Sequence, residues 1–394
     1  MNPIRLALIT LAALTTAACQ ITPRAPLPDA PPAAKTDTVV RFEASDFAAL
    51  PATADADWSA ALPALIESCR ALAKRPAWTS ACAQARQVTA GDARAFFQRA
   101  FTPYQIFSAT LVNGTEQSRT ATGLMTGYYE PLLTGSRTHG APYLYPLHKV
   151  PDDLLEIDLG SLYPELAHRR LRGKLEGRKV VPYESRAEIT GKNTLAGQEL
   201  VWVSDPIEAF FLQVQGSGRV QLPDGSQLRV GYADQNGHPY KAIGRWLVDQ
   251  GELKMTEVSM QSITDWARRN PQRLGELLNQ NPSYVFFRAS AVGDPKAGPK
   301  GALGVPLTPE RSVAVDRRFI PLGAPLVITA KQASTGGSIT RPVLAQDTGG
   351  AIRGPLRFDY FWGFGAAAGQ HAGRHKSEAA AWLLVPRGAT PADL

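Results

Sequence analysis

The spacing of apolar residues along the chain changes from a helical to a strand-like period about a third of the way in. Between residues 45 and 107 large apolar residues recur every three or four positions, as at Trp58, Leu62 and Leu65. This period predicts helices. We expect one helix to end near Pro76 and a second to run from about 92 to 101. Both are interpreted as scaffold.

From about residue 121 to residue 232 the pattern is a series of short apolar runs bounded by Gly, Pro and Asp, which predicts strands. The clearest hairpin joins a strand over 210–222 to a strand over 227–230. The turn between them is Pro223-Asp224-Gly225-Ser226, whose residue types favour a tight reversal of the chain. Beyond it the pattern predicts helices at about 241–250, 259–269 and 272–279, followed by a buried strand at 283–288.

The last hundred residues again predict short strands. Residues 291–301 have the composition of a loop and are a candidate domain crossing. After them we expect strands at 304–307, 311–315, 325–329, 341–346 and 381–386. Short strands this closely spaced, with glycines at the corners, favour a small closed barrel. The fold class is therefore mainly β with a helical N-terminal part.

The N-terminus has the features of a secretory signal. Arg5 precedes an apolar run over residues 6–18, which is too short to span a bilayer as a helix. Its end, Ala17-Ala18-Cys19, resembles a bacterial lipoprotein signal, in which the cysteine is lipidated. Cleavage at a small residue just upstream is the alternative. Residues 1–18 are thus a predicted signal peptide and the Pro-rich residues 19–40 a lipid-anchored tether. By the same resemblance, Gln20 indicates the outer membrane.

Composition adds limits to this interpretation. A chain of 394 residues with 44% apolar and 20% charged residues can bury a large core and should form two domains. The net charge of +7, or +6 without Arg5 (7 − 1), suits an anionic envelope polymer but is weak evidence. No stretch interleaves basic and aromatic residues, so we expect no nucleic-acid partner. In an oxidising compartment Cys69 and Cys82 can form one disulfide, and two buried thiols are the alternative.

The residues best suited to catalysis lie between Ala345 and Gly365. Asp359 is flanked by Phe358, Tyr360, Phe361 and Trp362, and an apolar setting raises the pKa of a carboxyl group, as a general acid requires. Asp347 lies in a Gly-rich turn, where it stays ionised or caps the loop. Asp316, beside Arg317 and Arg318, is a third candidate, equally well explained as an ion-paired turn residue.

Other patterns compete with this hypothesis. Asp347-Thr348-Gly349 resembles the loop of aspartic proteases, but the chain has one such loop and would have to dimerise. His371, His375 and Glu378 could bind a metal, although glycines at 369 and 373 interrupt a helix there, so a solvated segment is favoured. Of Tyr128 and Tyr129, adjacent in a predicted strand, at most one side chain can face a groove and stack on a sugar.

Several long motifs occur in order from about residue 126 to residue 386. They are TGYYEP, FFLQVQGSGRV, GYADQNGHPYKAIGRWL, NPSYVFFR, GVPLTPERSVAVDRRFIPLG and AQDTGGAIRG with FDYFWG. Through these motifs the chain resembles the membrane-bound lytic transglycosylase A family of Gram-negative bacteria. The last third also resembles the three-aspartate domain of cell-wall remodelling proteins, with Asp316, Asp347 and Asp359 as the three aspartates.

The resemblance implies a fold and a site. The fold would be a double-psi β-barrel domain, formed by residues 41–129 and 289–394, into which a second β-rich substrate domain, residues 130–288, is inserted, with a groove between the two. Asp359 would be the catalytic acid, with Asp347 and Asp316 supporting it. The residues that would line the groove are Thr126, Tyr128, Tyr129, Gln215, Gly216, Ser217 and Gly218. The resemblance implies no metal and no organic cofactor.

The implied reaction is non-hydrolytic cleavage of peptidoglycan glycan strands between N-acetylmuramic acid and N-acetylglucosamine, with formation of a 1,6-anhydro end. Two alternatives are a glycan hydrolase, with Asp347 or Glu130 activating water, and a non-catalytic peptidoglycan-binding lipoprotein. The implied location is the outer membrane, facing the periplasm. The implied partners are glycan strands and, through the lipid anchor, the outer membrane, and other cell-wall enzymes are further candidates.

Overall fold

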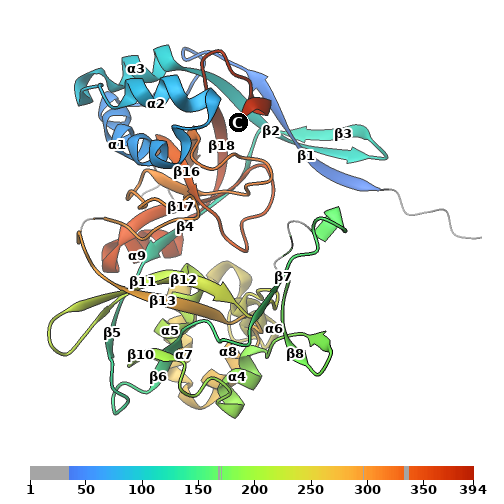
Figure 1. The fold of residues 1–394 in the computed structure, drawn as a ribbon, viewed down its shortest axis with the longest axis vertical. Helices are drawn as coiled ribbons and strands as arrows, with labels where there is room; N and C mark the ends of the chain where they lie inside the picture. Colours follow the sequence, from blue (N-terminus) through green and yellow to red (C-terminus); the bar gives the residue numbers. More distant parts are fainter. Residues whose placement is uncertain (1–34, 167–168, 170, 296, 332–336) are drawn as a thin grey trace, which may run out of the picture.

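Two bodies joined by two chain crossings make up the structure (Figure 1). The computed structural model describes residues 35–394 apart from 167–168, 170, 296 and 332–336. The predicted signal peptide, Cys19 and most of the predicted tether lie outside the described residues. Within the described part of the chain, no helix is long and apolar enough to cross a membrane.

The first body is built on a nine-stranded sheet that closes on itself. Its pairing order is β1-β2-β18-β15-β16-β14-β17-β4, with β3 on β2, and a further pairing of β18 with β4 closes a ring of six strands within the described residues. The strands are β1 (Thr36–Ala44), β2 (Phe101–Val112), β3 (Thr115–Thr120), β4 (Gly123–Glu130), β14 (Ser312–Ala314), β15 (Pro325–Lys331), β16 (Ser338–Asp347), β17 (Arg357–Phe364) and β18 (Lys376–Pro386). The closed barrel expected from the strand spacing is therefore present.

Three helices, α1 (Asp55–Leu72), α2 (Thr79–Ala85) and α3 (Ala93–Ala100), lie together on one side of this barrel, and α1 and α3 correspond to the two predicted helices (Figure 1). Helix α9 (Gly365–Arg374) connects β17 to β18 on the side of the inserted body. Helix α1 packs on β16, where the buried Gln346 amide donates a hydrogen bond of 2.8 Å to the carbonyl oxygen of Ala64. The expected disulfide is formed, joining Cys69 of α1 to Cys82 of α2.

The second body is inserted between β4 and β14. Its main sheet has the order β13-β12-β11-β5-β10-β6, and β7, β8 and β9 form a separate three-stranded sheet. The strands are β5 (Leu132–Ser136), β6 (Tyr145–His148), β7 (Leu155–Ile157), β8 (Leu171–Glu176), β9 (Lys179–Val181), β10 (Glu199–Val203), β11 (Ser217–Gln221), β12 (Gln227–Gln235) and β13 (Val285–Ala291); the helices are α4 (Arg186–Lys192), α5 (Pro206–Gln215), α6 (Ile243–Asp249), α7 (Met260–Arg269) and α8 (Leu274–Leu278).

One predicted strand is a helix. Residues 210–215, expected as the first part of a hairpin strand, form the second half of α5. The Asp205 side chain accepts hydrogen bonds from the first turn, Pro206 occupies the first helical position, and Gly216 ends the helix with a positive φ of 80°. A short apolar run fits a buried helix as well as a strand, so the end signals decide. The predicted turn at 223–226 is correct and joins β11 to β12.

Three other boundaries differ from the prediction. The helical pattern was extended to residue 107, but β2 starts at Phe101 and pairs along its length with β1. Strand β1 starts at Thr36, inside the range predicted to be tether, because its register with β2 supplies backbone partners that the sequence pattern does not reveal. Residues 304–307 were expected as a strand, but they contribute only an isolated bridge between Lys300 and Pro306.

A buried carboxylate holds the two crossings between the bodies. Glu130, the last residue of β4, is fully buried and accepts hydrogen bonds of 2.9 Å from Arg219 Nε and 2.8 Å from Arg229 Nε. The same guanidinium groups donate to the carbonyl oxygens of Pro295 and Ala297, where the chain returns to the barrel. The outgoing and returning segments are thus tied to one pair of strands, β11 and β12.

We predict that Glu130→Gln destabilises the protein strongly. The substitution leaves the buried Arg219 and the half-buried Arg229 guanidinium groups without a counter-charge. Breaking a buried pair typically costs about 3–5 kcal/mol, and we expect a loss of about 3 kcal/mol in the free energy of unfolding. Denaturant titration followed by far-ultraviolet circular dichroism measures it. Glu67→Gln, which removes the partly exposed pair with Arg70, is the matched control and should change stability by less than about 1 kcal/mol. Equal midpoints for the two variants would contradict the assignment.

Candidate active site

Strand register places the candidate catalytic residues in one row across the barrel. Ala314 of β14 pairs with Asp347 of β16 on one side and with Asp359 of β17 on the other. Asp359 in turn pairs with Thr126 of β4. Directly paired residues point to the same face of a sheet, and strands lie about 4.8 Å apart, so the two aspartates stand about 10 Å from one another across Ala314. The predicted proximity of Asp347, Asp359 and Thr126 is therefore present.

Asp359 is held by a threonine and an arginine. The Thr126 hydroxyl donates a hydrogen bond of 2.6 Å to Asp359 Oδ1, and Arg357 Nη1 donates one of 3.0 Å to the Thr126 hydroxyl oxygen. The Asp359 side chain is half-buried, between Phe358 and Tyr360, which are both fully buried but face the barrel interior. One oxygen of the carboxyl group is thus fixed in orientation by β4.

The surroundings of Asp359 favour its protonated form. Burial raises the pKa of Asp359 to about 6, while the hydrogen bond from Thr126 and the positive charge of Arg357 act in the opposite direction. The negative charge of Asp347 contributes a further, smaller increase in the pKa. A carboxyl group with a pKa near 6 can both donate and accept a proton close to neutral pH, which is the property of a general acid and base.

Asp347 has a different environment. The Tyr128 hydroxyl donates a hydrogen bond of 2.9 Å to its Oδ2, and the backbone N–H of Ala302 donates one of 2.9 Å to its Oδ1. Both oxygens therefore have donors. Burial and the negative charge of Asp347 raise the pKa of Tyr128 well above its usual value, so the phenol stays a donor.

Asp316 lies at the end of β14 and organises a loop. Its carboxylate forms an ion pair of 2.6 Å with Arg318 and accepts a hydrogen bond of 2.8 Å from the backbone N–H of Gly354. Burial opposes ionisation, but the hydrogen bonds from Arg318 and Gly354 lower the pKa of Asp316 below its ordinary value. Asp316 thus binds the turn before β17 to the end of β14, and its ion-paired interpretation fits best.

The side chains on the two faces of β4 lie in different environments. Thr126 and Tyr128 face Asp359 and Asp347, and the ring of Tyr128 packs on Phe361 at 5.2 Å. Gly127 and Tyr129 face the other way. A side chain at Gly127 would meet Trp362, and Tyr129 lies against Gly369 of α9. Of the two tyrosines predicted to line the groove, the structure therefore brings only Tyr128 to Asp359.

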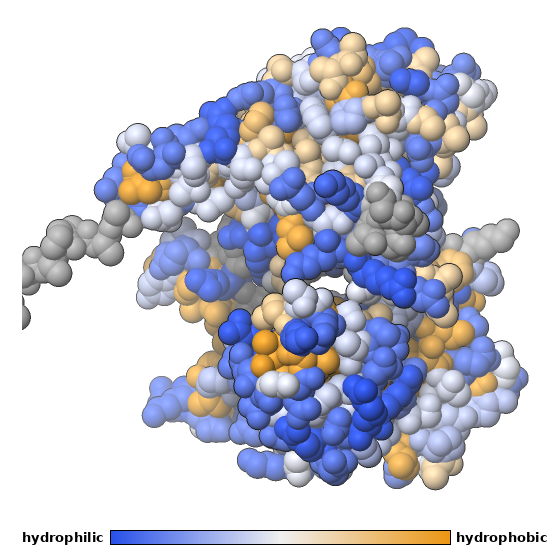
Figure 2. Space-filling view, turned by 180° about the vertical axis from the view of Figure 1, so that it is seen from behind, coloured by the Kyte–Doolittle hydropathy of each residue, from blue (hydrophilic) through white to orange (hydrophobic). Residues whose placement is uncertain are grey.

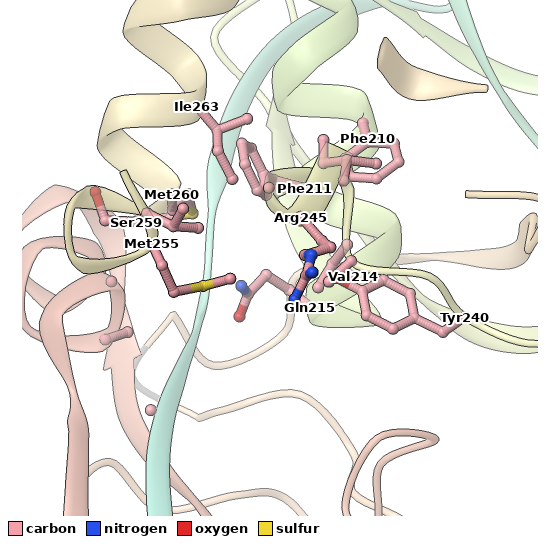
Figure 3. A pocket seen from close by; sticks show the side chains of 17 residues that line it. Phe210, Phe211, Val214, Gln215, Tyr240, Arg245, Met255, Ser259, Met260 and Ile263 are labelled. Carbon is pink, nitrogen blue, oxygen red and sulfur yellow. The ribbon is translucent and has the colours of Figure 1, made fainter. Parts of the chain in front are cut away.

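A mainly apolar cavity of about 340 Å³ lies between the two bodies on the side of β4 that Gly127 faces. Figure 3 shows Phe211 and Ile263 reaching toward one another from α5 and α7, with Met255 and Met260 on one side and Tyr240 on the other. In the space-filling view a recess separates the two bodies (Figure 2).

The predicted glycine-rich turn after α5 also lies at this boundary. Gln215 accepts a hydrogen bond of 3.0 Å from the backbone N–H of Tyr129, so it joins the inserted body to β4. Gly216 and Ser217 are half-buried, whereas Gly218 is buried against Leu212. The hydrogen bond from Tyr129 thus ties this turn to β4 and not to Asp359.

The histidine pattern considered for metal binding has another role. Trp362 Nε1 donates a hydrogen bond of 3.1 Å to Nδ1 of the buried His375, and the ring of His371 stacks on Trp362 at 4.8 Å. Among the described residues, no group of three or more His, Cys, Asp or Glu side chains is arranged to hold a metal ion.

Sequence reasoning missed three charged residues that shape this region. Arg357, which acts on Asp359 through Thr126, stands only two positions before the aspartate, and its basic character next to FDYFWG is the signal that could have indicated it. Arg219 and Arg229 lie opposite one another on β11 and β12. Their common partner Glu130 is 89 positions from Arg219, so no local pattern reveals the contact.

Comparison with known proteins extends these observations. The sequence matches the family described as "MltA specific insert domain" over residues 124–288 and the family described as "3D domain" over residues 311–385. It is 34% identical over 266 residues to the membrane-bound lytic murein transglycosylase A of Escherichia coli K12; the match covers 66% of this chain and 64% of the length of that relative.

Solved structures are similar over a larger share of the chain. MltA from Neisseria gonorrhoeae is 36% identical to this chain and superimposes with a TM-score of 0.74. The match covers 90% of this chain and 94% of the N. gonorrhoeae chain. The E. coli MltA structure with bound chitohexaose is 27% identical, with a TM-score of 0.65 and coverage of 88% of this chain and 94% of its own.

We predict that Thr126→Val raises the pKa of Asp359. The substitution removes a hydrogen bond that stabilises the carboxylate, so the protonated form persists to higher pH, by about one unit if the bond contributes about 1.5 kcal/mol. Infrared titration of the protonated carboxyl band, with Asp359→Asn as the reference that lacks it, measures this pKa. Thr134→Val, at an exposed position of β5, should leave the titration unchanged. A lower pKa in Thr126→Val would refute the role of the hydroxyl.

Proposed function

This chain belongs to the membrane-bound lytic murein transglycosylase A family, and we propose that it cleaves the β-1,4 bond between N-acetylmuramic acid and N-acetylglucosamine in peptidoglycan without water. The observation that carries the proposal is the raised pKa of Asp359, about 6, on the strand row that β4, β17, β14 and β16 form. One carboxyl group there is poised to act first as acid and then as base.

The reaction needs only this one carboxyl group. Protonated Asp359 donates its proton to the glycosidic oxygen, and the bond from that oxygen to C1 of the muramic residue breaks. The C6 hydroxyl of the same residue then bonds to C1, and its proton passes to the Asp359 carboxylate. The products are a strand ending in 1,6-anhydromuramic acid and a strand with a free N-acetylglucosamine hydroxyl. Asp359 is protonated again, and the nucleophile is held at high effective concentration because it belongs to the substrate.

The other carboxyl groups are poorly arranged to activate water, as a hydrolase requires. Both oxygens of Asp347 already accept hydrogen bonds, and Glu130 is fully buried between two arginines. Burial and the nearby Asp205 also raise the pKa of Glu208, but Glu208 interacts with Tyr129, whose side chain lies on the face of β4 away from Asp359. These contacts favour the non-hydrolytic reaction over the hydrolase.

Asp347 supports the reaction through its charge. The negative charge of Asp347, one strand away from β17, would favour the positive charge that develops at C1 as the bond breaks, and it also raises the pKa of Asp359. Tyr128 holds Asp347 in place. In this proposal Asp359 is the catalytic residue, whereas Thr126, Arg357, Asp347 and Tyr128 position it or set its charge.

The substrate would be a glycan strand lying between the two bodies. The E. coli neighbour was solved with bound chitohexaose, a chain of β-1,4-linked N-acetylglucosamine, which supports a glycan as the substrate class. In the same proposal the barrel is a double-psi barrel, as its closed six-stranded ring with two parallel pairings allows. The glycan would pass Tyr128, and the turn at 215–218 would form part of the opposite wall.

The cellular location follows from the N-terminal sequence. The relatives are named membrane-bound, and residues 17–19 resemble a lipoprotein cleavage site. We propose that Cys19 carries lipid in the outer membrane and that the body lies in the periplasm, where the Cys69–Cys82 disulfide is stable.

We predict that Asp359→Asn abolishes glycan cleavage, with a loss of at least about 1,000-fold, because the amide can neither donate the acidic proton nor take it back. Wild-type protein should yield 1,6-anhydro ends from purified peptidoglycan, measured by mass spectrometry. Asp347→Asn should lose less, about tenfold, since its role is electrostatic.

The product distinguishes the alternatives. Reducing ends from the wild type, with equal losses in Asp347→Asn and Asp359→Asn, would establish a two-carboxylate hydrolase instead. Binding of peptidoglycan in sedimentation without any cleavage would establish a non-catalytic binding protein. Glu67→Gln, on the outer surface of α1, is the control that should cleave at the wild-type rate.

A further inference from the structure

A small arm projects from the inserted body. Strands β7, β8 and β9 pair only with one another among the described residues, so this sheet is separate from the six-stranded sheet beside it. Its attachment is an ion pair of 2.9 Å between Arg172 of β8 and Asp234 of β12, together with the packing of Gly237 against Arg172. The arm is therefore attached through β8, and the residues that flank it, Leu154 and Tyr183, pack in the inserted body.

The arm carries apolar side chains into solvent. Leu175 and Val180 are direct cross-strand partners on β8 and β9, and they are 61% and 50% exposed. Leu162 and Tyr163, between β7 and the short 3₁₀ helix Pro164–Leu166, are 70% and 47% exposed. The strand register places Leu175 and Val180 at the C-terminal end of β8 and residues 162–163 in the segment that precedes its N-terminal end. We call these four residues, which lie at the two ends of the arm, the arm patch. Covering these side chains with another apolar surface would be favourable, by about 25 cal/mol for each Å² of apolar area removed from water.

Positive charge accompanies the arm patch. Arg178 and Lys179 lie at the turn from β8 to β9, directly beside Leu175 and Val180, and both are exposed. Glu176, paired with Lys179 across the turn, offsets part of this charge. Apolar residues rimmed by cations match the surface of an anionic bilayer better than they match a glycan, which offers hydroxyl groups.

The arm and the start of the chain reach the same side of the molecule. In Figure 1, β1, β3, β7 and β8 all lie toward the right of the view, whereas β5 lies toward the left. Lys35 is the first described residue, and residues 20–34 separate it from Cys19. Extended at about 3.1 Å per residue, such a tether spans at most about 50 Å. The membrane that holds Cys19 is thus within reach of this side.

We propose that the arm patch rests on the lipid surface to which the chain is tethered. Leu162 and Leu175 would enter the boundary of the acyl chains, Tyr163 would lie at the level of the headgroups, and Arg178 and Lys179 would pair with anionic phospholipids. The tether alone leaves the orientation of the body undefined, and the arm fixes it. This proposal rests on the proposed lipid anchor and is independent of the assignment of Asp359.

A dye at the tip of the arm tests the proposal. The chain has three cysteines, one proposed to be lipidated and two in a disulfide, so Leu162→Cys introduces a single free thiol for an environment-sensitive fluorophore. The full-length lipidated protein is placed in vesicles of phosphatidylethanolamine with a minor fraction of phosphatidylglycerol. We expect a blue-shifted emission that lipids brominated in their acyl chains quench. Leu132→Cys on β5, 50% exposed, is the matched control and should behave as in water.

Each other outcome counts against the proposal. Emission at position 162 that matches the Leu132→Cys control, in protein that floats with the vesicles, overturns it. A blue shift that brominated lipids do not quench and that grows with protein density indicates contact with a second copy and also overturns it. Protein that does not float lacks the anchor, and the proposal fails with it.

A second variant separates membrane contact from catalysis. Leu162→Asp with Leu175→Asp places carboxylates in the arm patch and should abolish the quenching of a fluorophore attached at position 180 through Val180→Cys. Cleavage of solubilised glycan in detergent should stay at the wild-type level, because the arm patch is outside the proposed catalytic row. Loss of cleavage in wild type and variant alike would instead refute the proposed function while leaving the membrane result intact.

Discussion

The buried ion cluster of Glu130, Arg219 and Arg229 is the interaction on which the arrangement of the two bodies depends. The chain leaves the barrel at Glu130 and returns near Ala297, and both points are bonded to the same two guanidinium groups. Arg219 also lies over the ring of Phe364, which pairs with Glu130 across β17 and β4. The end of β17 and both crossings are therefore held together by one cluster of ion pairs. This cluster fixes how the two bodies are arranged on either side of the recess.

Two carboxyl groups with different surroundings lie on one row of strands in the barrel. Asp359 and Asp347 flank Ala314 in one row, but their surroundings differ. Burial raises the pKa of Asp359, whereas both oxygens of Asp347 accept hydrogen bonds. Tyr128 contributes to both environments because it fills space beside Phe361 and donates to Asp347. The division of roles thus comes from the neighbours that strand pairing brings, since the two residues have the same side chain.

Local sequence patterns predicted the elements whose signals are local. The helical period around Trp58 and the turn at 223–226 have their causes within a few residues, and both are present. The aromatic sequence around Asp359 predicted a raised pKa, although Phe358 and Tyr360 face the barrel interior and the carboxyl group owes its burial to the packed strands. The prediction of a strand at residues 210–215 was wrong because a short apolar run fits a strand and a buried helix equally well. The capping residues Asp205 and Gly216 are what indicate the helix.

Features that depend on distant residues could not be predicted from local patterns. Strand β1 is defined by its pairing with β2, and the role of Glu130 is defined by arginines about 90 positions away. The sequence motifs indicated candidate site residues, but the separation of Tyr128 from Tyr129 onto two faces of β4 could be stated only as a rule of alternation. Which tyrosine faces Asp359 required the register with β17.

The position of the catalytic hydrogen bond in the chain has a consequence for how the protein is made. Thr126 and Asp359 are 233 positions apart, and β4 can pair with β17 and β18 only after the whole inserted body has been synthesised. Contacts of such long range form late, because the entropy of closing the loop must first be offset. A nascent chain crossing a membrane with its N-terminus first would therefore complete its active site last. Under the proposed function and location, a cell-wall-cleaving centre assembled in this order would stay inert until export of the chain is complete.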